Sequence, residues 1–430
     1  MKVLVVGSGG REHALAWALS KDSEVDEVYA APGNPGIAEI ARCVQISPTS
    51  IDELASFATE RKIDLTVVGP EAPLAIGIVD TFQRRGLRIF GPDKQAVRIE
   101  TSKSFAKDLC SKSHIPTPRW ETFTAATEAT KALDRFGPPW VVKADGLAAG
   151  KGTTVTRDRH EAESAIQREL QRDPGRVVVE EFIDGWEVTF MATVSGGRIR
   201  WLTPIFQDYK PVFDGDLGPN TGGMGCYSPV PTVTHSLVKR VEKTILAPTV
   251  AAMEKLGIHY QGLLNLNAIV RNRTEEPYVL EFNARFGDPE GQGVATITEN
   301  GLAAHLRGIA EGSDNPPVPK SIGTACVVVV LASKGYPTSQ SIGDKIIIRP
   351  FSNNSATIFH AGTARNPAGE LVTAGGRVLN VAATGSTVES ARRGAYSVIA
   401  KSIQFNGMHC RSDIGAERSR QRNLQAPRST

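Results

Sequence analysis

The stretch Val141–Gly152 reads Val-Val-Lys-Ala-Asp-Gly-Leu-Ala-Ala-Gly-Lys-Gly and organises the interpretation of the whole chain. A short apolar run carries Lys143, and a glycine-rich turn carries Lys151. Glycines let backbone N–H groups approach an anion, and the lysines add positive charge. The stretch therefore predicts a polyphosphate-binding turn, with a plain surface hairpin as the alternative. It is not a Walker A loop, because Asp145 stands at the first glycine position and Gly152 follows the lysine.

Length and composition describe a globular chain of several domains. The 430 residues are 40% hydrophobic and 22% charged, enough for two to four domains. Residues 411–430 hold five arginines and two acidic residues, so this segment alone accounts for the net charge of +3. The rest of the chain sums to zero and shows no basic patch that would indicate nucleic-acid binding. The five cysteines are scattered without a C-x-x-C pair, which favours free thiols in a reducing compartment. No apolar run is long enough to span a bilayer, and we expect a cytoplasmic protein.

The first hundred residues alternate between expected strands and helices. Strands are predicted at Lys2–Val6, Glu27–Ala31, Leu65–Val68 and Leu87–Phe90, which predicts an open parallel sheet. A glycine turn follows the first strand, but the third glycine of a dinucleotide fingerprint falls on Glu12. The second strand also lacks an acidic ribose ligand at its end, so NAD is not expected, while a single phosphate is plausible.

Turn residues stand at the ends of these strands. They form the stretches Ala31-Pro32-Gly33-Asn34-Pro35-Gly36, Gly69-Pro70-Glu71 and Gly91-Pro92. Open parallel sheets bind ligands at the carboxyl ends of their strands. These turns therefore predict a ligand site, with simple chain reversal as the alternative.

The middle of the chain supplies clustered acids. Residues 120–193 follow a βαβαβ-like pattern, in which the strand Val177–Ile183 carries Glu180 and Glu181 and is followed by Glu187. Beside a nucleotide, such carboxylates could take the adenine amino group and the ribose hydroxyls. A solvated strand edge is the alternative.

A second group of polar residues follows in the expected strand Tyr278–Phe282. Strand alternation puts Glu281 and Asn283 on one face. Carboxylate and amide oxygens suit Mg²⁺, a hard ion that also accepts phosphate oxygens. The alternative is an exposed polar strand face. Residues 207–225 are expected to be a long functional or disordered loop.

Prolines at 316, 317 and 319 mark the start of a last domain. Strands are expected at Thr324–Leu331, Lys345–Ile348, Ile358–Ala361 and Val378–Ala382, followed by a helix at Val388–Ile403. This composition predicts a small α+β domain.

The chain resembles the ATP-grasp ligases in the order of four features. These are the glycine–lysine stretch, the paired acids, the Pro-Asn-Thr-Gly-Gly-Met-Gly loop at 219–225 and the Glu-x-Asn strand. The chain is more closely similar to the phosphoribosylamine–glycine ligase family, from Met1 to about Gly415. The resemblance implies an α/β fold with an N-terminal open parallel sheet (1–101), a two-part ATP-grasp domain (102–322) with a mobile lid (about 120–193) and a small C-terminal α+β domain (323–415). It leaves residues 416–430 as a disordered tail.

The resemblance also implies ligands and residue roles. ATP and Mg²⁺ or Mn²⁺ are the implied cofactors, the partners are small molecules with neither nucleic acid nor membrane, and the protein is a monomer or weak dimer. Implied ATP-binding residues are Lys103, Lys143, Gly150, Lys151, Gly152, Glu180, Glu181, Ile183 and Glu187, and the implied metal ligands are Glu281 and Asn283. Implied catalytic residues are Arg285, Lys151 and Asp208. Implied substrate-binding residues are Gly9, Gly10, Gly33, Asn34, Glu71, Lys210, Asn220, Thr221, Gly222, Gly223, Met224, Asp288, Pro289 and Glu290.

Departures from the family pattern gather around the implied acid and amine site. Where the family usually reads Gln-Asp-His-Lys-Arg, this chain has Tyr209 in place of the histidine and Pro211 in place of the arginine. An arginine able to hold an anion is therefore absent. The usual Leu-Tyr-Ala-Gly-Leu-Met has Asn265 for tyrosine and Asn267 for glycine. Further departures are Ala284 for cysteine, Gly291 for threonine and Trp186 for a small or acidic residue.

Three functions remain open at this point. The first is ligation of glycine to phosphoribosylamine through an acyl phosphate, with ADP and phosphate released. The second is a paralogous ligase with a changed acid or amine, which the departures favour. The third is a nucleotide-binding protein without ligase activity, and Lys143, Glu281 and Asn283 count against it.

Overall fold

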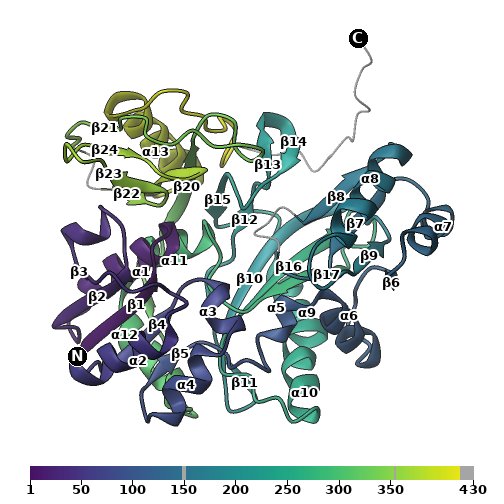
Figure 1. Ribbon diagram of the computed structural model, residues 1–430, viewed down its shortest axis with the longest axis horizontal. Coiled ribbons are helices and arrows are strands. Elements are labelled where there is room, and N and C mark those ends of the chain that lie inside the picture. The colour runs from purple at the N-terminus through teal and green to yellow at the C-terminus, as the bar shows by residue number, and fades with distance from the viewer. Residues whose placement is uncertain (148–151, 353–354, 417–430) are drawn as a thin grey trace.

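The computed structural model describes residues 1–147, 152–352 and 355–416 (Figure 1). Its N-terminal sheet is parallel throughout and has the order β3-β2-β1-β4-β5, which confirms the expected open sheet. The strands are β1 Lys2–Gly7, β2 Glu27–Pro32, β3 Arg42–Cys43, β4 Leu65–Val68 and β5 Ile89–Phe90. The helices are α1 Gly10–Ser20, α2 Ile51–Glu60, α3 Glu71–Ala75 and α4 Ile78–Arg84.

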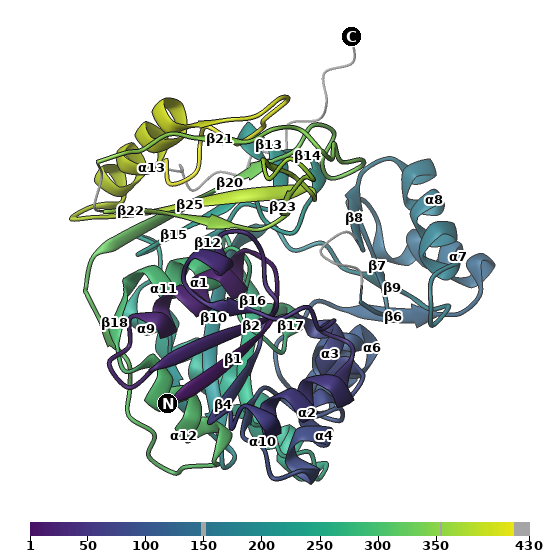
Figure 2. The same ribbon diagram turned by 60° about the vertical axis from the view of Figure 1, so that its left-hand side comes forward.

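A four-stranded antiparallel sheet stands to one side of the molecule, covered by two helices (Figures 1 and 2). We call it the lid unit, and its order is β6-β9-β7-β8. Its apolar core includes Leu133, Val142 and Ile166, separate from the other cores. Its elements are β6 Trp120–Phe123, α7 Ala126–Phe136, β7 Trp140–Ala144, β8 Thr153–Thr156, α8 Arg159–Leu170 and β9 Val177–Glu180.

The central sheet has the order β11-β10-β16-β17. The segment expected to complete the lid ran to Thr193, but residues 185–193 lie in β10, which pairs with β16 from Gly185 to Val194. Most of β10 is buried, so it belongs with this larger core. The strands are β10 Gly185–Ser195, β11 Arg198–Leu202, β16 Gly262–Arg271 and β17 Pro277–Asn283. Helices beside this sheet are α5 Arg98–Thr101, α6 Lys103–Lys112, α9 His235–Val241 and α10 Ala247–Lys255.

A third sheet, β12-β15-β20-β25-β22, packs against α13. Its strands β12 and β15 come from residues 207–228, so the long loop expected there is wrong in part. The buried strand β15 pairs with β20, and the segment before it folds back as the hairpin β13–β14. The elements are β12 Gln207–Asp208, β13 Pro211–Phe213, β14 Leu217–Asn220, β15 Gly225–Ser228, β20 Ala325–Ala332, β22 Ala356–His360, β25 Arg377–Gly385 and α13 Val388–Ser402.

The remaining elements are short strand pairs and two helices. They are α11 Glu290–Ile297, β18 Thr298–Asn300, α12 Leu302–Ala310, β19 Lys320–Ser321, β21 Ile347–Ile348, β23 Thr363–Arg365, β24 Leu371–Thr373 and β26 Ile403–Gln404. Among residues 1–147, 152–352 and 355–416, none of the helices has the length and apolar character needed to cross a bilayer.

Candidate active site

One large cavity lies where the lid unit and the sheets meet. Its volume is about 2510 Å³, and residues from all of these parts line it. A pocket of roughly 300–1,000 Å³ holds a drug-sized ligand. This cavity is therefore large enough for a nucleotide together with further substrates.

Two lysines and a glutamate form a buried cluster on the lid side. The Nζ atoms of Lys107 and Lys143 lie 3.0 and 2.9 Å from the two carboxylate oxygens of Glu180. Burial lowers the pKa of Lys107 to about 8, although Glu180 opposes the shift. Burial also opposes ionisation of Glu180, but the two lysines outweigh it and lower the pKa of that carboxyl. Because the glutamate already pairs with both lysines, its predicted contact with adenine stays a prediction.

The beginning of the glycine–lysine stretch is tied to α6. Asp145 accepts hydrogen bonds from the backbone N–H and the hydroxyl of Ser104, at 2.8 and 2.7 Å. Lys103 donates to the carbonyl of Gly146 at 3.5 Å. Gly152 lines the cavity, whereas Gly150 and Lys151 lie outside the described residues.

Residues expected near the adenosine line the same cavity. Glu181, Ile183 and Glu187 are among its lining residues. The Nζ atom of Lys210 lies 3.3 Å from Glu187 and 3.9 Å from Glu281. Burial opposes protonation of Lys210, but the neighbouring carboxylates outweigh it and raise the lysine pKa. The structure thus brings a predicted ribose ligand and a predicted metal ligand to one ammonium group.

Glu281 and Asn283 lie on one face of β17, as alternation predicts, and both line the cavity. Asn267 donates to Glu281 at 3.0 Å, and Arg285 donates to the Asn283 amide oxygen at 3.3 Å. Burial opposes ionisation of Glu281, but lysines led by Lys210 outweigh it and lower its pKa to about 2. Two hard oxygen donors held in this way fit Mg²⁺ or Mn²⁺ that completes its shell with phosphate and water.

Arg285 connects the central sheet to the N-terminal sheet. It forms ion pairs with Glu71 at 3.3 Å and with Glu100 at 3.2 Å. Arg11 lies 3.4 Å from the same Glu71. Burial opposes ionisation of Glu71, but Arg285 and Arg11 outweigh it and lower its pKa to about 2. Both arginines line the cavity, so an anionic substrate could compete for them with the glutamates.

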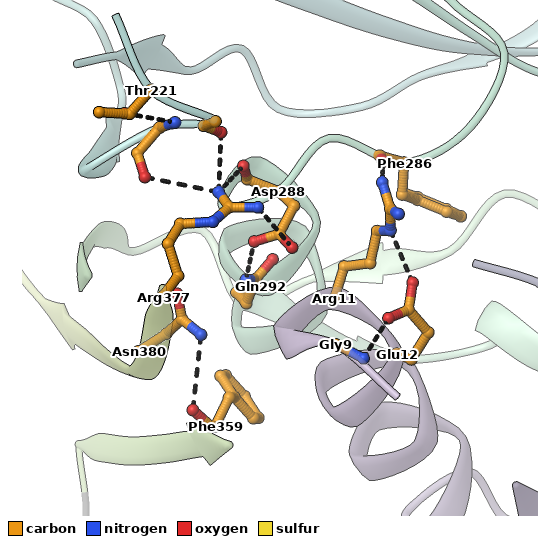
Figure 3. Close-up of polar contacts among 12 residues, drawn as sticks. Gly9, Arg11, Glu12, Thr221, Phe286, Asp288, Gln292, Phe359, Arg377 and Asn380 are labelled. Carbon is orange, nitrogen blue, oxygen red and sulfur yellow. Dashed lines mark hydrogen bonds and ion pairs between the residues drawn. The ribbon is translucent and has the colours of Figure 1, made fainter. Parts of the chain in front are cut away.

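A residue that the sequence interpretation missed, Arg377 of β25, reaches into the site (Figure 3). It donates to the carbonyls of Gly222 and Asp288, at 2.7 Å each, and pairs with the Asp288 carboxylate at 3.1 Å. Asn220, Thr221, Gly222 and Asp288 line the cavity. Arg377 therefore holds two predicted substrate segments together, although it lies more than 80 residues away from both in the sequence.

Several predicted substrate residues do not line the cavity. They are Gly9, Gly10, Gly33, Asn34, Gly223, Met224 and Pro289. The Asn34 side chain donates to the carbonyls of Ser8 and His360 and accepts from Gly36 and Ile37, so it joins the N-terminal and C-terminal sheets. Met224 is completely buried. Their binding roles stay predictions.

Glu12 explains why the first glycine turn does not resemble a dinucleotide site. Its carboxylate accepts from the Gly9 N–H at 2.5 Å and from Arg11 at 2.6 Å (Figure 3). A Cβ on Gly69 would lie only 2.2 Å from this carboxylate. The side chain therefore fills the space over the strand ends that a pyrophosphate would need.

The arrangement defines an ATP-grasp protein, because Lys143 of the lid unit, two lysines of α6 and a carboxylate–amide pair on the central sheet face one cavity. Models of the phosphoribosylglycinamide synthetase family match almost the whole chain: the N domain at residues 1–100, the ATP-grasp domain at 101–291 and the C domain at 326–417. The chain belongs to this family.

Relatives and solved structures agree with this assignment. The chain is 44% identical over 422 residues to phosphoribosylamine–glycine ligase of Halalkalibacterium halodurans, covering 97% of each. It is 45% identical to the ligase of Ralstonia nicotianae, covering 96% of this chain and 99% of the relative. The crystal structure of the Thermotoga maritima ligase superposes with a TM-score of 0.83 at 34% identity, covering 96% of this chain and 100% of that one. Biotin carboxylase of Campylobacter jejuni, at 14% identity and a TM-score of 0.73, shares the fold alone.

Proposed function

We propose that this protein joins glycine to phosphoribosylamine at the expense of ATP, forming glycinamide ribonucleotide, ADP and phosphate in purine biosynthesis. One observation carries the proposal: a single cavity is lined by Lys103 and Lys143, by Glu281 and Asn283, and by Arg285. Family membership and relatives of the same length support it. Residues 1–101, 102–322 and 323–415 would be its functional parts, in a cytoplasmic enzyme with five free cysteines.

The proposed roles follow from the negative charges that the substrate carboxylate and the ATP phosphates bring together. ATP supplies a phosphoryl group that turns the acid into an acyl phosphate, from which the amine then displaces phosphate. Bringing a carboxylate to an anionic phosphate 4 Å away costs about 4 kcal/mol per charge pair at an effective dielectric near 20. Lys103 and Lys143 would offset this repulsion at the phosphates, and Arg285 would hold the carboxylate or the transferring phosphoryl group.

A divalent metal would add to this compensation. Glu281 and Asn283 would hold Mg²⁺ or Mn²⁺, and Asn267 would orient the glutamate through its hydrogen bond. The lid unit would cover the nucleotide and exclude water from the acyl phosphate. Water exclusion matters because an acyl phosphate hydrolyses when it is exposed.

A ligase of the same class with a different acid is the second candidate. The departures from the family pattern that line the cavity are Trp186, Pro211, Asn265 and Asn267, whereas Tyr209, Ala284 and Gly291 do not line it. Tyr209 instead packs under Arg411, whose guanidinium lies 4.8 Å from the ring centre. Three changes on the central sheet, at Trp186, Asn265 and Asn267, are therefore the observation that favours a changed acid.

The test is ADP release by purified protein with ATP and Mg²⁺. Release that requires both phosphoribosylamine and glycine is the expected result. Release with another acid in place of glycine would favour the second candidate. ATP binding without acid-dependent release would overturn both.

A further inference from the structure

Two buried acceptor atoms in the cavity have no donor among the residues that the structure describes. They are Oδ1 of Asn265, a residue that is 1% exposed, and Oδ1 of Asp208, which is 9% exposed. A buried polar atom without a partner costs roughly 1–3 kcal/mol, so such atoms are rare unless a ligand or water completes them. Both residues line the cavity.

Glu290 supplies a third acceptor beside these two. Its Oε1 accepts from the Thr189 hydroxyl at 3.0 Å, which fixes the carboxylate. A Cβ placed on Gly287 would lie 2.3 Å from Glu290 Oε2 and 3.2 Å from Asn265 Nδ2, so this glycine lets the two side chains come together. Likewise, a Cβ on Gly223 would lie 3.2 Å from Asp208 Oδ1. The missing side chains leave room for the acceptors and for a small ligand.

The carboxyl groups of Asp208 and Glu290 also form no ion pair of their own, although Lys210 lies near enough to Asp208 to oppose the rise of its pKa. No ion pair within 4.0 Å joins either of them to a basic side chain in the described part of the chain. The basic side chains around them pair elsewhere: Lys210 with Glu187, Arg285 with Glu71 and Glu100, and Arg377 with Asp288. Burial and the nearby Glu290 raise the pKa of Asp208 well above its usual range. Two neighbouring acids without a counter-charge indicate that a cation is brought by the ligand.

We propose that Asp208, Glu290 and Asn265 form the subsite for the ammonium group of the amino-acid substrate. An ammonium group has three donors and no acceptor, which matches three acceptor groups, and its positive charge would favour the ionised form of the two carboxyl groups among them. The register pairs Asn265 with Asn283 across β16 and β17, so the carboxylate of a small amino acid bound here would reach the proposed metal site. The family pattern usually has tyrosine at this position, so Asn265 places an amide oxygen where that pattern has a phenol ring. The inference rests on the proposed function and names the class of acid.

The first experiment compares acids with the wild-type protein. ADP release is measured with ATP, Mg²⁺ and phosphoribosylamine, using glycine, acetate, glycolate and N,N-dimethylglycine. The proposal expects kcat/KM at least 100-fold higher for glycine than for acetate or glycolate, and a smaller loss for the dimethylated amine, which keeps one N–H. Equal turnover of acetate and glycine would overturn it.

Variants then assign the subsite. Asp208→Asn, Glu290→Gln and Asn265→Leu should each raise KM for glycine by tenfold or more, with KM for ATP changed less than twofold. Asn265→Asp should retain the low KM for glycine, because it keeps an acceptor. The matched control is Asn315→Leu, at an exposed asparagine. Equal losses for ATP and glycine would show a structural role and would overturn the assignment.

Direct binding separates this inference from the proposed function. Glycine is titrated calorimetrically into the protein with Mg²⁺ and a non-hydrolysable ATP analogue, so no turnover is needed. Binding at least tenfold weaker in Asp208→Asn supports the subsite even if the ligase reaction fails, and equal binding overturns it. Counting the Mn²⁺ ions bound per protein tests whether a metal ion occupies the subsite instead of an ammonium group. Loss of one ion in Asp208→Asn would make this a metal site and would overturn the ammonium assignment.

Discussion

Two walls of the same cavity differ in how their buried charged groups are paired. On the wall that we propose for the nucleotide (the nucleotide wall), Lys107 and Lys143 pair with Glu180 at 3.0 and 2.9 Å, so these charges are paired before any ligand binds. On the wall that we propose for the acid (the acid wall), Asp208 and Glu290 interact electrostatically without forming an ion pair, and Asn265 has an unused acceptor. The difference indicates that the nucleotide wall is stabilised by the fold itself, whereas the acid wall, under the proposed subsite, would be completed by its ligand.

The largest effect on stability should come from removing the negative charge that pairs with the two lysines of the nucleotide wall. Glu180→Gln leaves two ammonium groups buried without a counter-charge, and breaking a buried ion pair in this way costs about 3–5 kcal/mol. We expect a clear fall in the denaturant midpoint of unfolding. Glu163→Gln is the control, because its pair with Arg159 is at the surface and contributes less than about 1 kcal/mol. Equal midpoints for both variants would contradict the claim that this wall depends on internal pairing.

A second prediction concerns Glu281 in the proposed metal site of the same cavity. Glu281→Gln removes a negative ligand while keeping the shape, and we expect the Mg²⁺ affinity and kcat/KM to fall about 10- to 100-fold, with partial rescue by excess Mn²⁺. Mg²⁺ titrations of ADP release measure this. Glu276→Gln, outside the cavity lining, is the control and should retain full activity. Unchanged metal dependence would remove Glu281 from the site.

The third prediction tests whether Arg377 holds the acid wall in place. Arg377→Lys keeps the charge but loses the fork that donates to Gly222 and Asp288. We expect about a tenfold fall in kcat/KM for glycine in the ADP-release assay, with nucleotide affinity unchanged. Arg365→Lys, at an exposed arginine, is the control. A loss of ATP affinity instead would show that the two walls are not independent.

The smallest effect concerns a third region, where buried groups remain neutral. His13 Nδ1 accepts from the His360 N–H at 2.8 Å, which requires an unprotonated nitrogen. Burial, together with neighbouring groups, lowers the pKa of His13 to about 3 and of His360 to about 4. Because the folded pKa values lie below the unfolded value of about 6.5, their stabilisation is complete above pH 6.5 and is lost as the pH falls. The loss is about 1 kcal/mol per histidine at pH 6.

Thermal unfolding at pH 7.5 and pH 6 measures this effect. The wild-type midpoint should fall between these pH values, and His13→Asn should show a smaller fall because one titrating group is gone. An identical pH dependence in the two proteins would show that His13 does not contribute.

Much of the fold could be predicted because it is encoded locally. The β-branched runs and turn residues of the first hundred positions predict the parallel sheet, and the helix expected at 388–403 agrees with α13. Alternation along β17 places Glu281 and Asn283 on one face, as the structure has them. Prediction failed where pairing partners are remote: β10 joins β16 instead of the lid unit, and β15 joins β20. Such pairings depend on which buried surfaces meet, and a local pattern does not contain that information.

By itself, the sequence determined the class of chemistry: lysines near a glycine turn, oxygen ligands on a strand, and the family that combines them. Only the tertiary structure decided which charges meet. It placed Lys107 on Glu180 and brought Arg377 from the C-terminal sheet to Asp288. It also left one buried oxygen each of Asp208 and Asn265 without a donor among the described residues, near the carboxylate of Glu290. The physical reason is that compensation of a buried charge depends on distances of about 3 Å between residues that are far apart in the chain.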